Sequence, residues 1–244
     1  MSKLAATLFL TTIAQGALAE CPVLEGHLIQ GGLIWGNVPP GSTVNLDGSS
    51  LDVLEDGTFF AGFGRNAAST SELVIDGPVS CRQTLTVKSR EYRISRVEGV
   101  PQQTVTPSEE HLARINRERA IVGAAKSQRL QRPDLLNDAL AGFEWPTTGR
   151  ISGVYGSQRI YNGTPKNPHY GVDVAVPTGT PVYAPTAGVI TLVEPDLFYS
   201  GGTVILDHGY GLSSSFLHMS KVHVEVGQEI STGDLIGEVG ATGR

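Results

Sequence analysis

The spacing of the hydrophobic residues changes twice along the chain, and these changes divide it into three stretches. From residue 20 to residue 96, short apolar runs such as HLIQGGLIW and LDVLEDGTFFAGF alternate with Gly, Pro, Asn and Asp. Runs of this length separated by Asp-Gly pairs are typical of strands joined by tight turns. The pattern predicts a small β domain over residues 20–96.

A helical spacing replaces the strand pattern in the middle of the chain. The residues that recur at helical intervals and form one apolar face are Leu112, Ile115, Val122 and Ala125. Thr106 is suited to the N-cap and Pro107 to the first helical position, while Glu109 completes a capping box. Pro133 is expected to end this helix, and the segment DLLNDALAGF predicts a second, shorter one. Residues 97–142 are therefore expected to form a helical connector.

Strand spacing returns after the connector. β-branched runs such as GVITLVE, GGTVILDHG and KVHVEVG are separated by Gly and Pro at short intervals. These runs predict a β-rich domain over residues 143–244. The whole chain is thus expected to be mainly β, with a β-sheet C-terminal domain, a small N-terminal β domain and a short α-helical connector.

The beginning of the chain carries a targeting signal. MSKLAATLFLTTIAQGALAE has an early cation at Lys3, a short apolar run and a final small-x-small triplet, ALA. We identify residues 1–19 as a secretory signal peptide, so the mature protein is expected in the periplasm or the extracellular space. No later segment has the roughly 18 apolar residues that a transmembrane helix needs. Lipidation at Cys21 is the alternative, but Glu20 stands where such signals need a small residue.

Composition and charge exclude one class of partner. The chain has 244 residues, of which 40% are hydrophobic and 17% charged, as in globular proteins. Its net charge of -6 lacks the excess of Lys and Arg that phosphate binding needs. Nucleic acid is therefore not expected as a partner.

The two cysteines fit an exported protein. Cys21 and Cys81 are the only ones, and an even pair in an exported chain indicates a disulfide. Closing this loop would stabilise the fold by about 4 kcal/mol on the chain-entropy relation. A two-cysteine metal site is the alternative, but no companion His or Cys stands at ligand spacing.

A histidine and an aspartate stand close together in the C-terminal stretch. The valines of NPHYGVDVAV fall at alternate positions, so we expect His169, Gly171, Asp173 and Ala175 to share the opposite face of one strand. Imidazole nitrogen and carboxylate oxygen are zinc ligands, and catalytic zinc usually has three protein ligands and a water. The pair supplies two. A hydrogen-bonded pair without metal is the alternative interpretation.

Motifs around this pair follow one another in a specific order. They are GRISGVYG, PHYGVDVAVPTGTPVYAPTAGVI, GGTVILDHGYG and SSFLHMSKVHVEVGQEISTGDLIGEVGATGR. In this order they resemble the lysostaphin-type (LytM-like) zinc metallopeptidases, a family that cuts peptides in bacterial peptidoglycan. The resemblance covers about the last hundred residues of the chain.

The resemblance implies roles for three residues. His169 and Asp173 would be zinc ligands, and His218 would help to hold the attacking water or to stabilise the developing oxyanion. It also implies Zn²⁺ as the cofactor, metal-assisted hydrolysis as the reaction and peptidoglycan peptides as the substrate. The strand pattern is compatible, because Phe216 and His218 are expected on one face and Met219 on the other.

The sequence departs from the family at one place. The family's third zinc ligand and its second catalytic histidine come from an HxH motif, and none of the six histidines forms one. We therefore expect a C-terminally truncated peptidase domain that binds zinc weakly and hydrolyses its substrate poorly. His111, His208 and His223 are not expected to be ligands.

Two other functions remain open from the sequence. Some relatives that have lost zinc activate other cell-wall hydrolases, so a non-catalytic regulator is the main alternative. A lipoyl-like carrier is the second, because VGQEISTGDLIGEVG resembles the strand-turn pattern of that fold. No lysine that could be modified follows Lys221, which argues against the carrier.

Overall fold

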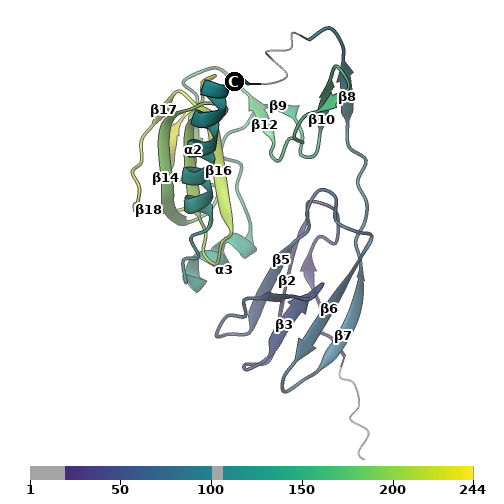
Figure 1. Cartoon of the computed structure of the whole chain (residues 1–244). Helices are drawn as coiled ribbons and strands as arrows, with labels where there is room; N and C mark the ends of the chain where they lie inside the picture. Colours follow the sequence, from purple (N-terminus) through teal and green to yellow (C-terminus); the bar gives the residue numbers. More distant parts are fainter. Residues whose placement is uncertain (1–19, 101–106, 244) are drawn as a thin grey trace, which may run out of the picture. The chain divides into compact units, whose positions relative to one another are not determined.

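The computed structural model describes residues 20–100 and 107–243, which form two compact units (Figure 1). The first unit contains the described residues up to Leu28 together with Gly32–Gly62 and Ala68–Lys88. The second contains Ile29–Gly31, Phe63–Ala67 and the chain from Ser89 onward. Two short segments that interrupt the first unit in sequence thus belong to the second.

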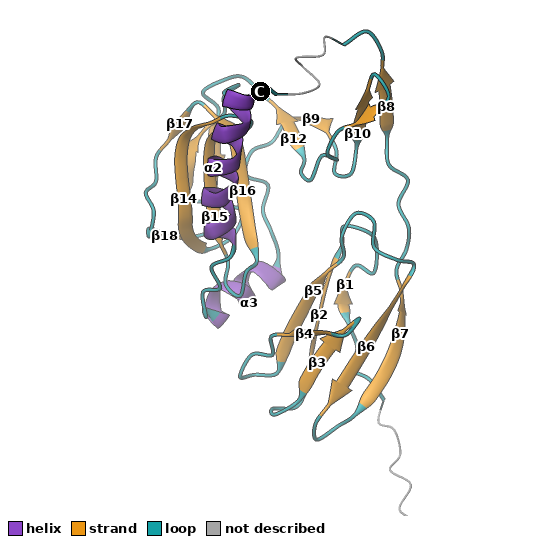
Figure 2. Cartoon of the chain, viewed as in Figure 1, coloured by secondary structure: helices purple, strands orange, loops and turns teal. Residues whose placement is uncertain are grey.

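The first unit consists of two antiparallel sheets, as the alternating pattern predicted (Figure 2). One sheet has the order β1-β2-β5 and contains β1 (Glu25–Gly26), β2 (Leu33–Asn37) and β5 (Thr58–Gly62). The other has the order β4-β3-β6-β7 and contains β3 (Thr43–Leu46), β4 (Ser49–Leu51), β6 (Thr70–Asp76) and β7 (Cys81–Thr86). Alternate residues of β2 and β6 are buried, and the core includes Ile34, Phe59, Leu73 and Ile75.

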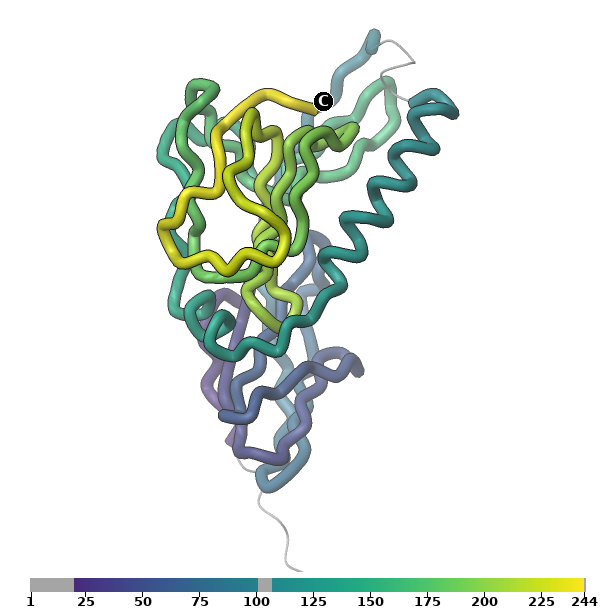
Figure 3. The backbone as a smooth tube through the Cα atoms, turned by 90° about the vertical axis from the view of Figure 1, so that its left-hand side faces the viewer, coloured from purple at the N-terminus to yellow at the C-terminus, as the bar shows by residue number. Residues whose placement is uncertain are grey.

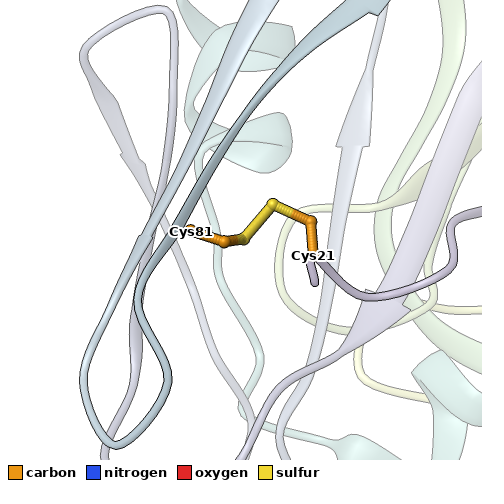
Figure 4. The surroundings of a disulfide bond; sticks show 2 residues. All are labelled: Cys21 and Cys81. Atoms are coloured by element: carbon orange, nitrogen blue, oxygen red, sulfur yellow. A yellow bond between two sulfur atoms is a disulfide. The ribbon is translucent and has the colours of Figure 1, made fainter. Parts of the chain in front are cut away.

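A disulfide joins Cys21 to Cys81 at the start of β7 (Figure 4). It confirms the prediction made from the even cysteine pair. The bond links residues 60 positions apart and ties the segment before β1 to the edge strand of the four-stranded sheet.

Replacing both Cys21 and Cys81 by alanine is expected to lower the free energy of unfolding of the first unit by about 4 kcal/mol, because the unfolded chain regains the entropy that the closed loop removes. Urea unfolding measures the change, with Trp35 fluorescence followed in a Trp145→Phe background. A loss below about 1 kcal/mol would contradict the stabilising role of the bond.

The second unit contains four sheets among its described residues (Figure 2). The largest has the order β16-β15-β14-β18 and contains β14 (Gly188–Leu197), β15 (Gly201–Asp207), β16 (Ser213–Met219) and β18 (Glu229–Ile230). A second, with the order β13-β19-β17, contains β13 (Pro181–Tyr183), β17 (Lys221–Val222) and β19 (Leu235–Glu238). The small sheets β12-β9 and β11-β10-β8 contain β8 (Ile94–Val97), β9 (Arg150–Gly153), β10 (Gln158–Tyr161), β11 (Thr164–Pro165) and β12 (Asp173–Ala175). The fold is mainly β, as expected from the sequence.

Strand β15 is buried along its whole length, which fits the three consecutive apolar residues Val204, Ile205 and Leu206 at its centre. On one face of the sheet, Val204 and Leu206 pack into a cluster with Ile190 and Ile236. On the other face, Ile205 packs with Leu192 and Ala125. This strand carries the core on which the rest of the unit is built.

Helix α2 (Glu109–Lys126) lies along the second face of that sheet (Figures 1 and 3). Ala125 and Ile115 are buried, as the apolar spacing predicted, but Leu112 is 41% exposed. The predicted capping box was wrong: Ser108 is the N-cap and its Oγ accepts the N–H of His111, so Pro107 precedes the helix. Thr106 lies outside the described residues.

The second predicted helix is confirmed as α3 (Pro133–Ala141). Pro133 is its first residue rather than the end of α2, because α2 already ends at Lys126. Leu135, Leu136 and Ala139 form its buried face.

The change in sequence pattern suggested a boundary after residue 96. The main stretch of the second unit begins earlier, at Ser89, because strand β8 pairs in parallel with β10 of that unit.

No helix in the described ranges is long and apolar enough to cross a membrane. The signal peptide expected over residues 1–19 lies outside them.

His208, next to the end of β15, is fully buried. Its Nδ1–H donates to the carbonyl of Ala187 at 2.7 Å, and its Nε2 accepts the hydroxyl of Ser214 at 2.8 Å. The ring of Phe143 packs edge-on against it at 5.4 Å between centroids. Burial lowers the pKa of His208 below its ordinary value of 6.5. These contacts give His208 a structural role in the core of the second unit.

The lowered pKa of His208 predicts how the stability of the fold changes with pH. Below about pH 6.5 the unfolded chain binds a proton that the native imidazole refuses, so stability falls as pH decreases, by at most about 1.4 kcal/mol per pH unit. We expect wild type to lose more stability between about pH 7.5 and pH 5.5 than a His208→Gln variant. Urea unfolding of both proteins at the two pH values measures this difference. An equal loss in both would assign the pH dependence to other titratable groups, among which the buried Asp207 has a raised pKa.

Candidate functional site

His169 lies in the loop before β12 and is held by the turn of residues 154–157, which precedes β10. The backbone N–H of His169 donates to the carbonyl of Ser157 at 2.8 Å, and the N–H of Gly156 donates to the carbonyl of His169 at 2.7 Å. The Nδ1–H of His169 donates to the carbonyl of Val154 at 3.3 Å. Backbone and imidazole of His169 are therefore attached to the same turn.

The bond from Nδ1 determines what the other ring nitrogen can do. With the proton on Nδ1, Nε2 of a neutral imidazole is an acceptor. Nε2 faces Oδ1 of Asp173 at 3.1 Å, and both side chains are partly open to solvent. Two acceptors at this distance repel each other unless a proton or a cation lies between them.

His169 and Asp173 are in contact, but they do not lie on one strand as the sequence predicted. The expected strand shared by His169, Gly171, Asp173 and Ala175 was wrong, because β12 contains only Asp173–Ala175. Its pairing with β9 shifts register directly after Asp173, and Val172 is 49% exposed rather than in a buried face. The loop and the register shift, rather than alternation along a strand, bring His169 and Asp173 together.

Gly153 on β9 makes room for the carboxylate. A Cβ at Gly153 would lie 2.0 Å from Oδ2 of Asp173, so the carboxylate would have to move. A Cβ at Gly171 would lie 3.7 Å from Nε2 of His169, which is an ordinary contact. Only glycine at position 153 is therefore compatible with the observed position of Asp173.

The pair fits a zinc ion. Two ligand atoms of a tetrahedral zinc site are separated by about 3.3 Å, close to the spacing of Nε2 and Oδ1. A histidine ligand typically donates its other N–H to a carbonyl or carboxylate, as His169 does to Val154. Within residues 20–100 and 107–243, no group of three or more His, Cys, Asp or Glu is placed to hold a metal ion.

His218 lies in β16 with a left-handed backbone, at φ 62°, which is uncommon for a residue other than glycine. The pairing of β15 with β16 skips one residue here, so that Gly202 opposes Met219 while Val204 opposes Phe216. The expected alternation was therefore wrong: Phe216 and Met219 both pack against the same core. A β-bulge is what places His218.

Thr242 fixes the ring of His218. Its carbonyl accepts the Nδ1–H of His218 at 2.7 Å. Its hydroxyl donates to the carbonyl of Met219 and accepts the N–H of Gly202, both at 2.9 Å. This role of Thr242 had no signal in the sequence, although the segment GATGR belonged to the motif, because spacing alone could not reveal a contact across 24 positions.

The remaining C-terminal histidine stands apart from the pair. His223 faces Glu238, with Nε2 3.0 Å from Oε1. In the described part of the chain, no hydrogen bond or ion pair joins His218 to His169 or Asp173. Among the three expected site residues, a direct contact thus joins two, His169 and Asp173.

Comparison with known proteins finds one family. Residues 167–244 match the family model for peptidase family M23. Peptidoglycan DD-endopeptidase ShyA of Vibrio cholerae is 37% identical over 112 residues, which are 46% of this chain and 26% of that protein. Lipoprotein NlpD/LppB homolog of Pseudomonas aeruginosa is 31% identical over 111 residues, which are 46% of this chain and 35% of that protein. The chain therefore matches about a third or less of the length of these curated relatives.

A solved structure resembles more of the chain. The crystal structure of a candidate M23 peptidase from Pseudomonas aeruginosa aligns with a TM-score of 0.65 and 29% identity, over 88% of this chain and 84% of that one. The likeness in fold thus extends well beyond residues 167–244.

Adding one methyl group at Gly153 is expected to displace the carboxylate of Asp173 and to weaken metal binding by about 10- to 100-fold, the range seen when the surroundings of a ligand are disturbed. Zinc affinity of the Gly153→Ala variant, measured by competition with a chromophoric chelator, checks this. The matched control is Gly171→Ala, which adds the same group at an ordinary distance and should bind as wild type does. Equal affinity of all three proteins would show that metal binding does not depend on the position that Gly153 gives to the Asp173 carboxylate.

Proposed function

We propose that this chain, whose residues 167–244 match peptidase family M23, acts as a zinc-dependent endopeptidase on the peptides of bacterial peptidoglycan. The observation that carries the proposal is the pair of acceptors at 3.1 Å, Nε2 of His169 and Oδ1 of Asp173, oriented as zinc ligands. The relative described as a peptidoglycan DD-endopeptidase supports the substrate class.

Zinc held by His169 and Asp173 would polarise a scissile carbonyl and activate water for attack on it. The protein's own residues orient and transfer protons. Because the Nδ1 proton of His218 is bound to the carbonyl of Thr242, its Nε2 is the atom that can accept a proton or, once protonated, donate to an oxyanion. The left-handed backbone of His218 is strain of the kind that functional residues carry.

We place the protein outside the cytoplasm. The Cys21–Cys81 disulfide supports export, because such bonds form in oxidising compartments. With two of three protein ligands supplied by the described residues, zinc affinity and turnover of the chain as given are expected to be low.

One observation favours a second function, a non-catalytic regulator of cell-wall hydrolases. It is that the described residues contain no group of three metal ligands. A regulator would bind no zinc and would digest no wall material, but would accelerate digestion by a separate hydrolase.

Zinc content and wall digestion separate these two functions. Native protein in which a third ligand completes the site is expected to contain about one zinc per chain and to release peptide fragments from purified sacculi. Recombinant His169→Ala and Asp173→Asn variants should lose zinc, because each removes a ligand. The His218→Ala variant should keep its zinc while hydrolysis falls by about 100-fold or more. His223→Ala is the control that should change neither property.

Native protein without zinc and without activity on sacculi would exclude the peptidase. If such protein also accelerated a separate hydrolase, the regulator would be the correct assignment.

A further inference from the structure

The turn of residues 154–157 that holds His169 is attached to a residue far earlier in the chain. Nε of Arg65 donates to the carbonyl of Gly156 at 2.8 Å, across 91 positions. Its Nη1 donates to Oδ1 of Asn66 at 2.9 Å, and its Nη2 lies 3.5 Å from Oε1 of Gln158. Each nitrogen of this guanidinium thus already has a partner within the second unit, so Arg65 is a structural donor rather than a group waiting for an anionic ligand.

Tyr92 fixes both partners of this hydrogen bond. Its hydroxyl donates to the backbone carbonyl of Arg65 at 3.1 Å, and the guanidinium lies over its ring at 4.3 Å from the centroid. Gly156 has a left-handed backbone, at φ 83°, and a Cβ there would lie 2.0 Å from the Tyr92 ring. The turn is therefore packed directly against Tyr92.

From the turn, two hydrogen bonds lead to the candidate zinc ligand. The N–H of Gly156 donates to the carbonyl of His169, and the carbonyl of Val154 accepts the imidazole Nδ1–H. We infer that Arg65 is a positioning residue, which fixes this turn through Gly156 and so orients the imidazole of His169. Its relevance to zinc rests on the proposed function.

Burial of Gly156 makes the bond from Arg65 hard to replace. When the guanidinium is removed, the carbonyl of Gly156 is left without its charged donor at a place with little access to water. The turn must then move to find another partner, and the hydrogen bonds to His169 move with it. Arg65, Tyr92 and Val154 all lie outside the matched residues 167–244, so the family match does not include them.

Hydrogen exchange and zinc affinity of the Arg65→Ala variant test this inference. In the metal-free protein, protection of the amides of Gly156 and His169 should fall about tenfold, while that of core amides in β15 stays unchanged. Zinc affinity should fall about tenfold as well, because the ligand loses its fixed orientation. Arg82→Ala is the matched control, since Arg82 is an exposed arginine of the first unit paired with Glu72, and it should alter neither property.

Arg65→Lys asks which contact of Arg65 matters. Lysine keeps a cation near the Tyr92 ring but has a methylene group where arginine has the Nε–H that donates to Gly156, so we expect a variant as impaired as Arg65→Ala. A lysine variant equal to wild type would overturn the assignment to the Gly156 hydrogen bond. Unchanged exchange at Gly156 and His169 in Arg65→Ala would overturn the positioning role altogether.

A failure of the proposed function would give a different result from a failure of the positioning role of Arg65. If wild type binds no more zinc than His169→Ala does, the zinc site is wrong, while the exchange measurement still decides whether Arg65 holds the turn.

Discussion

The hydrogen bond from Nδ1 of His169 to the carbonyl of Val154 is the interaction on which the candidate site depends. It leaves Nε2 as an acceptor that faces the carboxylate of Asp173, and so converts two ordinary side chains into a pair suited to a cation. Gly153 permits the carboxylate to approach, and the turn of residues 154–157 supplies the carbonyl. Without that carbonyl the imidazole could rotate, and the pair would be a common surface contact.

His218 is oriented in the same way, because the main-chain carbonyl of Thr242 accepts a hydrogen bond from its Nδ1–H. Both histidines thus present Nε2, although their backbones differ. His169 is held in a loop, whereas His218 is placed by a bulge with a left-handed backbone. Main-chain acceptors are well suited to this purpose, because their positions follow from the fold and not from the rotamer of another side chain.

The sequence predicted the parts of the fold that depend on local pattern. Alternating runs predicted the strands of the first unit, the helical spacing predicted α2 and α3, and the cysteine pair predicted the disulfide. It also singled out His169 and Asp173, whose contact the structure shows. What it missed depends on long-range contact: the register shift after Asp173, the bulge at His218, and Ser108 as the N-cap of α2. Arg65 gave no signal, because a polar residue between strands looks the same whether it is solvated or bonded to a carbonyl 91 positions away.

The hydrogen bond between Arg65 and Gly156 joins residues 91 positions apart, which affects when it can form during folding. Contacts between distant segments form late in folding, since the entropy of closing a long loop must be offset first by contacts already made. The strands of the first unit can pair locally, whereas the turn beside His169 is complete only when Phe63–Ala67 has joined the second unit. We therefore expect the candidate ligand to acquire its final orientation only after Arg65 has reached the turn.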